Sequence, residues 1–386
     1  MAPSPARGED GTWLLDLDVD MSELEGKAFT CDDKCGLCCL CQAEVLPHEL
    51  PFFKKNHPDR IVMKNEPHRH AALALKNGEG PCSFLSSGRR CQIYAQRPHY
   101  CRQFPFHMYV GTRVQVELDL SCRGVWYGGR EDALVIGGQM VSEHAEVLRR
   151  TLQQSLAVHR EFEMNCAEAG IARAPEALRR TMEQHLPDLM DPLYLAHVLD
   201  LSAEEEEMES LPTMSSLPTY DRRELEASAR ETGLESLSAE DVYSAPVYCD
   251  PAGIWNVLLA RDGKVEWTVM DDDGKVSPVR SIDPRKVQLL QPEGLGREVF
   301  IDYLRILNRR DSMLGYAYFL VDDYGYEDPL ANTYYGAMAA AALDLLWRSS
   351  LIAHMRGGKL DREGMIEGII SFDMDRLDAP TIGAFI

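Results

Sequence analysis

The sequence predicts an α+β protein made of a loop-rich cysteine domain, a helical segment, and a C-terminal β-meander followed by helices. Nine of the eleven cysteines lie between Cys31 and Cys122. Apolar residues recur at helical spacing after Asp132, and strand-like runs joined by Asp-Gly turns open the last third of the chain. We expect a cysteine domain over residues 1–130, a helical segment over 131–201, a linker or long loop over 202–245 and an α+β domain over 246–386.

The N-terminal part of the chain lacks the periodic patterns that build an ordinary core. Residues 12–19 alternate apolar and acidic side chains like a half-buried strand, and residues 22–27 predict a short helix. From Cys31 to Tyr127 the sequence is rich in Cys, Pro, His and Gly, and only residues 47–56 predict a helix. Because such a region can hardly assemble an apolar core, its order must come from metal ligation by thiolates. The expected domain is therefore metal-stapled.

Helices are predicted next. Ala145, Leu148, Leu152, Leu156 and His159 follow the spacing of one amphipathic helix that ends near Cys166. A second helix should follow the Ala-Pro boundary at residues 174–175, with a third short one over residues 192–199, and these helices should pack on the cysteine domain. The polar, proline-punctuated residues 202–220 indicate a linker or long loop.

The last third predicts a meander and then helices. Three runs, residues 254–260, 264–270 and 276–282, are joined by Arg261-Asp262-Gly263 and by the Asp271–Gly274 turn. The Asp triplet in that turn lacks the glutamate at the twelfth position of a calcium loop, so a tight turn is favoured. Helices are expected over residues 297–307, 312–320, 333–355 and 361–372, and the third is apolar on nearly all sides, which predicts a core helix.

Charge and hydropathy exclude two classes of partner. The formal net charge is −22 and no block of Lys and Arg interleaves with aromatic residues, so we expect no nucleic acid as main partner. No apolar run has the length of a signal peptide or of a membrane span, so we expect no membrane and a cytoplasmic location. In a reducing compartment an odd number of cysteines favours free thiols over disulfides.

The cysteine spacing itself predicts metal binding. In Cys31-x3-Cys35-x2-Cys38, a short turn lets thiolates reach a metal while backbone N–H groups point at the sulfurs, and Gly36 sits where a positive φ is useful. Neighbouring side chains of an extended backbone point to opposite sides, so Cys38 and Cys39 would naturally serve different centres. We therefore expect two metal centres that share this segment.

The order of four signatures resembles a known family. CGLCC preceded by Cys31, then PCSFL, CQIYAQRPHYCRQFPF and SCRGVW, are similar to the CxxCxxCC-type cysteine-cluster family, a zinc- or iron-chelating domain that includes flagellin lysine-N-methylases. The similarity spans roughly residues 29–128. It implies eight metal ligands: Cys31, Cys35, Cys38, Cys39, Cys82, Cys91, Cys101 and Cys122. Cys41 is extra to the pattern, and Cys166 and Cys249 are expected to be ordinary buried thiols.

The identity of the metal stays open between two chemistries. Soft thiolates select both iron–sulfur clusters, for example of the 4Fe-4S type, and zinc. The neighbours Phe84, Tyr94, Tyr100, Arg97 and Arg102 favour a cluster, because they could shield it and offset its negative charge. The alternative is that Arg97 pairs with an acid while Phe84 and Phe104 fill a small core. Four loop histidines, His68, His70, His99 and His107, could also join a metal site, and His99 is the strongest candidate among them.

Two functions of different class remain. The resemblance implies modification of a protein partner or substrate, with S-adenosylmethionine as a possible methyl donor, although no catalytic residue can be named. Classical radical chemistry is disfavoured, because the strand and helix repetition of a barrel is missing after the cysteine motif. The alternative is a non-enzymatic, metal-stapled interaction or assembly module, in which the metal only supplies folding free energy.

Overall fold

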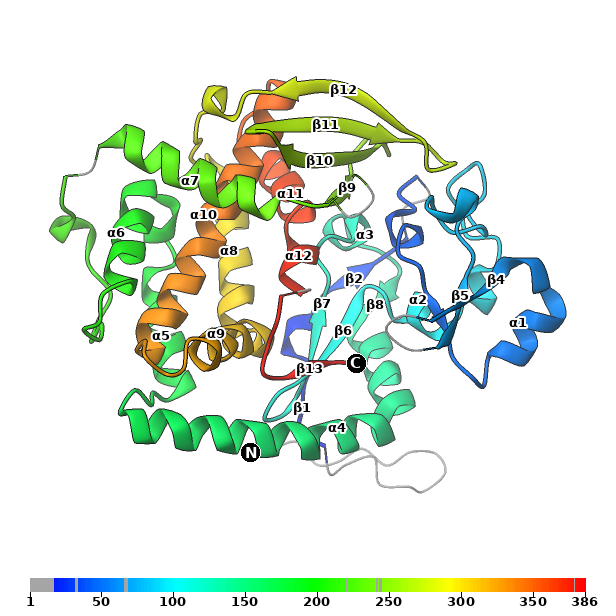
Figure 1. The fold of residues 1–386 in the computed structure, drawn as a ribbon, viewed down its shortest axis with the longest axis horizontal. Coiled ribbons are helices and arrows are strands. Elements are labelled where there is room, and N and C mark those ends of the chain that lie inside the picture. Colours follow the sequence, from blue (N-terminus) through cyan, green and yellow to red (C-terminus); the bar gives the residue numbers. More distant parts are fainter. Residues whose placement is uncertain are drawn as a thin grey trace.

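The computed structural model describes residues 17–31, 34–65, 69–219, 221–240, 242, 245–377 and 379–386, and it has the mixed α+β architecture that the sequence predicts. The cysteine-rich residues lie at one end and most of the helices lie at the other, while the meander runs along one side (Figure 1). No helix in the described part of the chain is long and apolar enough to cross a membrane.

The cysteine-rich region contains more regular structure than its composition predicts. A three-stranded antiparallel sheet and one helix are formed by β3 (Glu44–Val45), α1 (Leu50–Asn56), β4 (Ile61–Lys64) and β5 (His70–Leu73). Phe53, Leu73 and Phe84 are buried together with Cys82. The expectation that this region can hardly form an apolar core is therefore corrected: a small core exists, and one of the predicted ligands belongs to it.

A second sheet joins distant parts of the chain. Its order is β1-β7-β6-β13, formed by β1 (Val19–Asp20), β6 (Phe106–Val110), β7 (Val114–Leu118) and β13 (Ala384–Phe385). Only β1 and β7 pair in parallel. Residues 12–16 of the predicted strand lie outside the described residues. A short ladder of β2 (Ala28–Phe29) and β8 (Glu131–Asp132) closes the region, with α2 (His99–Gln103) and α3 (Arg123–Trp126) between the sheets.

The long helix α4 (Ala133–Ala169) packs along β6 and β7 (Figure 1). It begins where the Asp132 carboxylate accepts hydrogen bonds from the backbone N–H groups of Leu134 and Val135. It ends at Gly170, whose φ of 76° closes the last turn in the left-handed region. The predicted helix is thus confirmed, and it extends slightly beyond Cys166.

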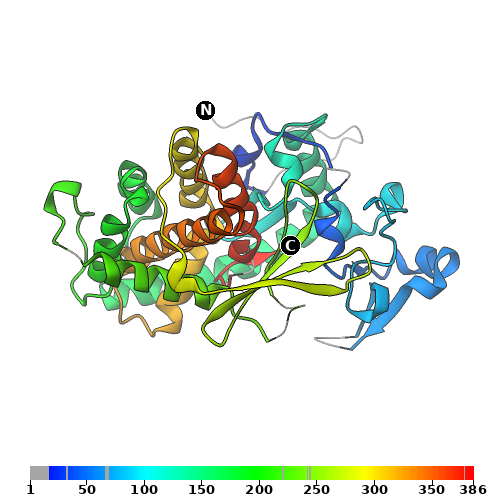
Figure 2. The ribbon, with the colours of Figure 1, turned by 90° about the horizontal axis from the view of Figure 1, so that it is seen from above.

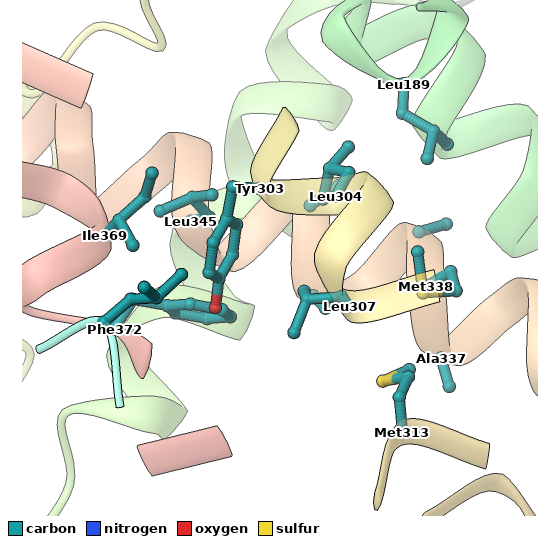
Figure 3. Packing of buried hydrophobic residues seen from close by; sticks show 14 of the residues in the cluster. Leu189, Tyr303, Leu304, Leu307, Met313, Ala337, Met338, Leu345, Ile369 and Phe372 are labelled. Carbon is teal, nitrogen blue, oxygen red and sulfur yellow. The ribbon is translucent and has the colours of Figure 1, made fainter. Parts of the chain in front are cut away.

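The helical half is built around α10 (Leu330–Arg356), which is buried along most of its length as predicted for the core helix. Its neighbours are α5 (Pro175–His185), α6 (Pro192–Ser202), α7 (Arg222–Ser236), α8 (Leu295–Arg309), α9 (Asp311–Asp323), α11 (Arg362–Ile370) and α12 (Asp373–Leu377). Leu304, Leu307, Met338, Leu345 and Ile369 interdigitate between these helices (Figure 3). The sequence did not predict α7, which follows the loop residues 203–219.

The predicted meander is confirmed and gains a fourth strand. The antiparallel order is β12-β11-β10-β9, from β9 (Val247–Cys249), β10 (Trp255–Arg261), β11 (Lys264–Met270) and β12 (Val276–Ile282). Asp271 forms the predicted tight turn, because its carboxylate accepts hydrogen bonds from the backbone N–H groups of Asp273 and Lys275. Figure 2 shows these strands reaching from the helices to the cysteine-rich region.

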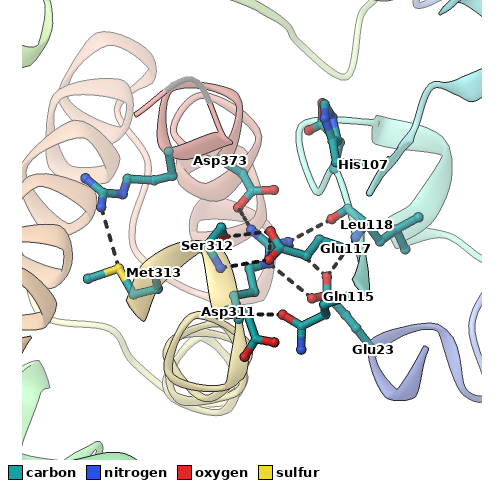
Figure 4. Close-up of polar contacts among 12 residues, drawn as sticks. Glu23, His107, Gln115, Glu117, Leu118, Asp311, Ser312, Met313 and Asp373 are labelled. Atoms are coloured by element: carbon teal, nitrogen blue, oxygen red, sulfur yellow. Dashed lines mark hydrogen bonds and ion pairs between the residues drawn. The ribbon is translucent and has the colours of Figure 1, made fainter. Parts of the chain in front are cut away.

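Buried ion pairs connect the N-terminal part of the chain with the C-terminal helices. Arg310, at the start of α9, contacts Glu23 from the N-terminal segment, Glu117 from β7 and Asp373 from α12. Figure 4 shows these acids converging between the sheet and the helices. Burial raises the pKa of Glu117 to about 7, although Arg310 opposes this effect. These ion pairs hold β7 in place, and the chain reaches Cys122 shortly after β7 ends.

Candidate metal centre

The CGLCC segment folds as one 3-10 turn over Leu37–Cys39, and Gly36 makes this turn possible. Gly36 has a φ of 60°, which confirms the positive φ expected from the sequence. Its backbone carbonyl accepts a hydrogen bond from the Cys39 N–H at 3.0 Å. A Cβ atom at this position would lie 3.3 Å from both Leu85 and Trp255. The turn is therefore packed tightly on both sides. Because this segment is a 3-10 turn and not extended backbone, the Cys38 and Cys39 side chains do not point to opposite sides as the sequence predicts: they hydrogen-bond to each other and both line one cavity.

One cavity of about 420 Å³ is lined by most of the cysteines. Cys82 and Cys91 face it from the loop after β5, and Cys101 faces it from α2. The Cys82 N–H donates to the Cys39 carbonyl at 2.7 Å, which joins this loop to the CGLCC turn. The cysteines that line this first cavity are Cys31, Cys38, Cys39, Cys41, Cys82, Cys91 and Cys101.

A second cavity of about 230 Å³ adjoins the first on the other side of the turn. Four cysteines line it: Cys31, Cys35, Cys38 and Cys122. Cys122 precedes α3 and its N–H donates to the Asp119 carbonyl at 3.2 Å, so the end of β7 positions it. The N-terminal turns of α4 complete the wall through Ile136 and Met140.

The two cavities divide the predicted ligands. Cys31 and Cys38 line both cavities, whereas Cys35 and Cys122 line only the second. All eight predicted cysteines thus lie around two adjoining spaces. As the side chains stand, no three His, Cys, Asp or Glu residues among those described converge closely enough to hold one metal ion.

Burial and mutual repulsion keep most of these thiols protonated in the absence of metal. Burial and the neighbouring thiolates of Cys82, Cys38 and Cys91 raise the pKa of Cys101 to about 12. Burial also raises the pKa of Cys122 well above its ordinary range, with Asp119 adding repulsion. Cys38 differs from these two residues, because a hydrogen bond with the Cys39 side chain lowers the pKa of Cys38. A metal that binds here must displace several protons.

Arg97 is a cation that lines both cavities. Its Nε donates to the Tyr94 carbonyl at 3.0 Å, and its guanidinium lies 3.8 Å from the centre of the Tyr94 ring. The positive charge lowers the pKa values of Cys38, Cys91 and Cys101 against the effects that raise them. In contrast, Arg102 lies near a carboxylate, with its Nη2 atom 3.7 Å from Oε1 of Glu49.

The histidines stand apart from both cavities. The Nε2 atoms of His99 and His144 face each other between α2 and α4, and burial and His144 lower the pKa of His99 to about 4. His107 lies 3.4 Å from Asp119; although burial disfavours its charged form, this contact raises the pKa of His107. His70 lies in β5, and His68 lies outside the described residues. The cavity linings contain none of the described histidines in this group.

Cys249 is a contact that sequence reasoning missed. It is fully buried at the end of β9, as expected for an ordinary thiol, but its Sγ atom lies 3.7 Å from the Cys35 carbonyl oxygen. A hydrogen bond with the Cys35 side chain, together with burial, raises the pKa of Cys249. No local pattern could have indicated this contact, because the two residues are more than 200 positions apart. Cys166 is also buried, in the helical half.

The cysteines around the two cavities lie in a part of the chain that is similar to a zinc- or iron-chelating domain. Residues 30–123 match the model of the CxxCxxCC family, which is described as "Putative zinc- or iron-chelating domain". This match covers about a quarter of the chain and includes all eight predicted ligands. Searches of curated proteins and of solved structures found no match.

Proposed function

We propose that this protein holds two metal centres, each bound by four thiolates, and that both are iron–sulfur clusters. The proposal rests on the two adjoining cavities. Cys38 lines both of them, whereas its neighbour Cys39 lines only the first. Four of the predicted ligands line the second cavity. The other four line only the first cavity. The first centre is assigned to Cys39, Cys82, Cys91 and Cys101, and the second to Cys31, Cys35, Cys38 and Cys122.

The donor set fits a cluster better than zinc. Tetrahedral zinc with Zn–S bonds of about 2.3 Å requires sulfurs roughly 3.8 Å apart. The first cavity of about 420 Å³ is lined by seven cysteines, which offers room for ligands spread around a larger inorganic core. When bound, an iron–sulfur cluster supplies electron transfer or Lewis-acid chemistry. Arg97, on the wall of both cavities, would offset part of its negative charge.

The metal is identified by assaying iron, zinc and acid-labile sulfide in protein purified without oxygen. The expected result is brown protein with iron and sulfide in matching amounts. Colourless protein that contains two zinc ions and no sulfide would refute the cluster proposal, but it would agree with the two-centre arrangement.

The two-centre arrangement is tested by Cys38→Ser and Cys39→Ser made separately. Each variant should lose about half of the bound metal, and the combined variant should lose nearly all of it. Cys166→Ser is the matched control, because Cys166 is a buried thiol far from the cavities. If Cys38→Ser and Cys39→Ser remove the same metal, so that combining them costs nothing further, the assignment is wrong.

The finer proposal is that the centres serve methylation of a protein partner with S-adenosylmethionine as donor, as the resemblance to lysine-methylating relatives implies. It is supported by an open groove of about 410 Å³ beside the first cavity, lined in part by Cys41, Cys101, Tyr100 and Phe385. An open groove beside a metal centre offers room for a substrate segment. The large number of thiols also fits a reducing compartment such as the cytoplasm.

Binding of labelled S-adenosylmethionine to the loaded protein, measured by equilibrium dialysis, tests this finer proposal. Saturable binding that disappears when the metal is removed supports the methyltransferase. Absence of binding to fully loaded protein favours the competing function, a metal-stapled interaction module in which the metal contributes on the order of 10 kcal/mol of folding free energy.

A further inference from the structure

The N-terminal end of the meander packs directly on the CGLCC turn. The Trp255 Nε1–H donates to the Cys35 carbonyl at 2.7 Å, and the same ring covers Gly36. The buried Cys249 Sγ atom lies 3.7 Å from that carbonyl oxygen and 3.7 Å from the Asp250 carbonyl oxygen, and the Cys35 side chain is a further hydrogen-bond partner of the thiol. Two residues of the C-terminal half therefore contact one proposed ligand of the second centre.

The backbone of Cys249 is also fixed from the side of a second proposed ligand. Arg123, the residue after Cys122, donates from Nε and Nη2 to the Cys249 carbonyl at 3.1 and 2.5 Å. Arg123 is only 3% exposed and forms an ion pair with Glu367 of α11 at 2.7 Å. Cys249 is thus held in place by the loop that carries Cys122, while its thiol reaches the loop that carries Cys35.

We propose that Cys249, which lies outside the matched residues 30–123, is a positioning residue of the second metal centre. In the loaded protein its single S–H donates to the Cys35 sulfur, in place of the neighbouring carbonyl oxygens, and keeps that sulfur turned toward the cavity. Groups that hydrogen-bond to metal ligands fix the ligand orientation, and their loss commonly weakens metal binding by 10- to 100-fold. The inference rests on the proposed two-centre arrangement. It adds a residue from the C-terminal half of the chain that orients a ligand of the second centre.

The test compares two substitutions that separate hydrogen bonding from packing. Cys249→Val removes the donor and adds about one methyl group of volume, whereas Cys249→Ser keeps a donor in a smaller side chain, and the Cys166 variants carry the same changes of volume. Release of metal from the loaded full-length protein to a coloured chelator is followed over time. About half of the metal should leave Cys249→Val on the order of 10-fold faster than wild type, while Cys249→Ser stays within about twofold. Cys166→Val and Cys166→Ser, the matched controls, should release metal at the wild-type rate.

The outcomes distinguish this inference from the proposed function. Wild-type rates in Cys249→Val, or acceleration in Cys249→Ser as large as in Cys249→Val, would overturn the role of the thiol as donor. In a Cys39→Ser background, which should retain only the second centre, the acceleration should affect all of the metal. In a Cys38→Ser background it should vanish. Wild-type protein with a single metal centre contradicts the two-centre proposal, and Cys249 is then judged from the release of that centre alone.

Discussion

Arg310→Met should destabilise the protein far more than an ordinary surface substitution. The Arg310 guanidinium is 1% exposed and donates to Glu23 at 2.9 and 3.1 Å, to Asp373 at 2.8 Å and to the Leu118 carbonyl at 2.8 Å. Its removal leaves three buried carboxyl groups, those of Glu23, Asp373 and Glu117, without their shared cation. Breaking a buried pair in this way costs about 3–5 kcal/mol of unfolding free energy.

The pH dependence of this loss follows from the same network. Without Arg310 the pKa values of Glu117 and Asp373, which burial already raises, should rise further, so the folded protein holds protons that the unfolded chain releases above about pH 4.5. The unfolding free energy of the variant should therefore fall as pH rises, and its deficit relative to wild type should be larger at pH 8 than at pH 6. Glu117, whose pKa is already raised to about 7, should contribute most over this interval.

The assay is urea unfolding of the metal-loaded protein, followed by far-ultraviolet circular dichroism at both pH values. Arg305→Met is the matched control, because Arg305 pairs with Glu183 and Asp302 on the surface at 35% exposure. That loss should stay below about 1 kcal/mol. A deficit for Arg310→Met no larger than that of Arg305→Met, and equal at the two pH values, would refute the reasoning.

Three further predictions concern the metal site. Gly36→Ala should cost about 1–2 kcal/mol of unfolding free energy, since the left-handed backbone at φ 60° is strained for alanine and the new Cβ would press on Trp255; thermal melting measures it. The metal-free protein should lose stability between about pH 9 and 12, because folded Cys101 keeps its proton there while the unfolded chain ionises; the loaded protein, whose thiolates are already deprotonated, should lack this loss. Arg97→Gln should move the pH midpoint of metal loading upward by about one unit, measured by metal titration across pH, since Arg97 favours the thiolates.

The sequence predicts the structural elements that depend only on residues close together in the chain. The Asp-Gly turns of the meander, the all-round apolar helix α10 and the positive φ of Gly36 depend on a few neighbouring residues, and each was confirmed. The match over residues 30–123 likewise confirms the signatures that the sequence presents. These features need no information about the rest of the fold.

Contacts between distant residues could not be predicted in this way. The pairing of Cys249 with Cys35, and of His99 with His144, depends on how whole elements dock. Helix α7 was missed because its polar sequence gains burial through tertiary packing, mainly against α10, where Gly233 allows the Trp347 ring to approach the helix backbone. Intrinsic propensity is a weak guide when tertiary packing decides the outcome.

The cysteine domain contacts the C-terminal meander at two places, both at the same end of its strands. Cys249 contacts Cys35, and the Asp271–Gly274 turn accepts hydrogen bonds from Lys76 and Arg89, each 2.6 Å from an Asp272 oxygen. Because the loops that carry Cys35, Cys82 and Cys91 are all held in this way, metal ligation should order the interface between the two halves as well as the cysteine loops. Removal of metal should therefore loosen the meander, and the free energy of metal binding should contribute to the stability of the whole chain.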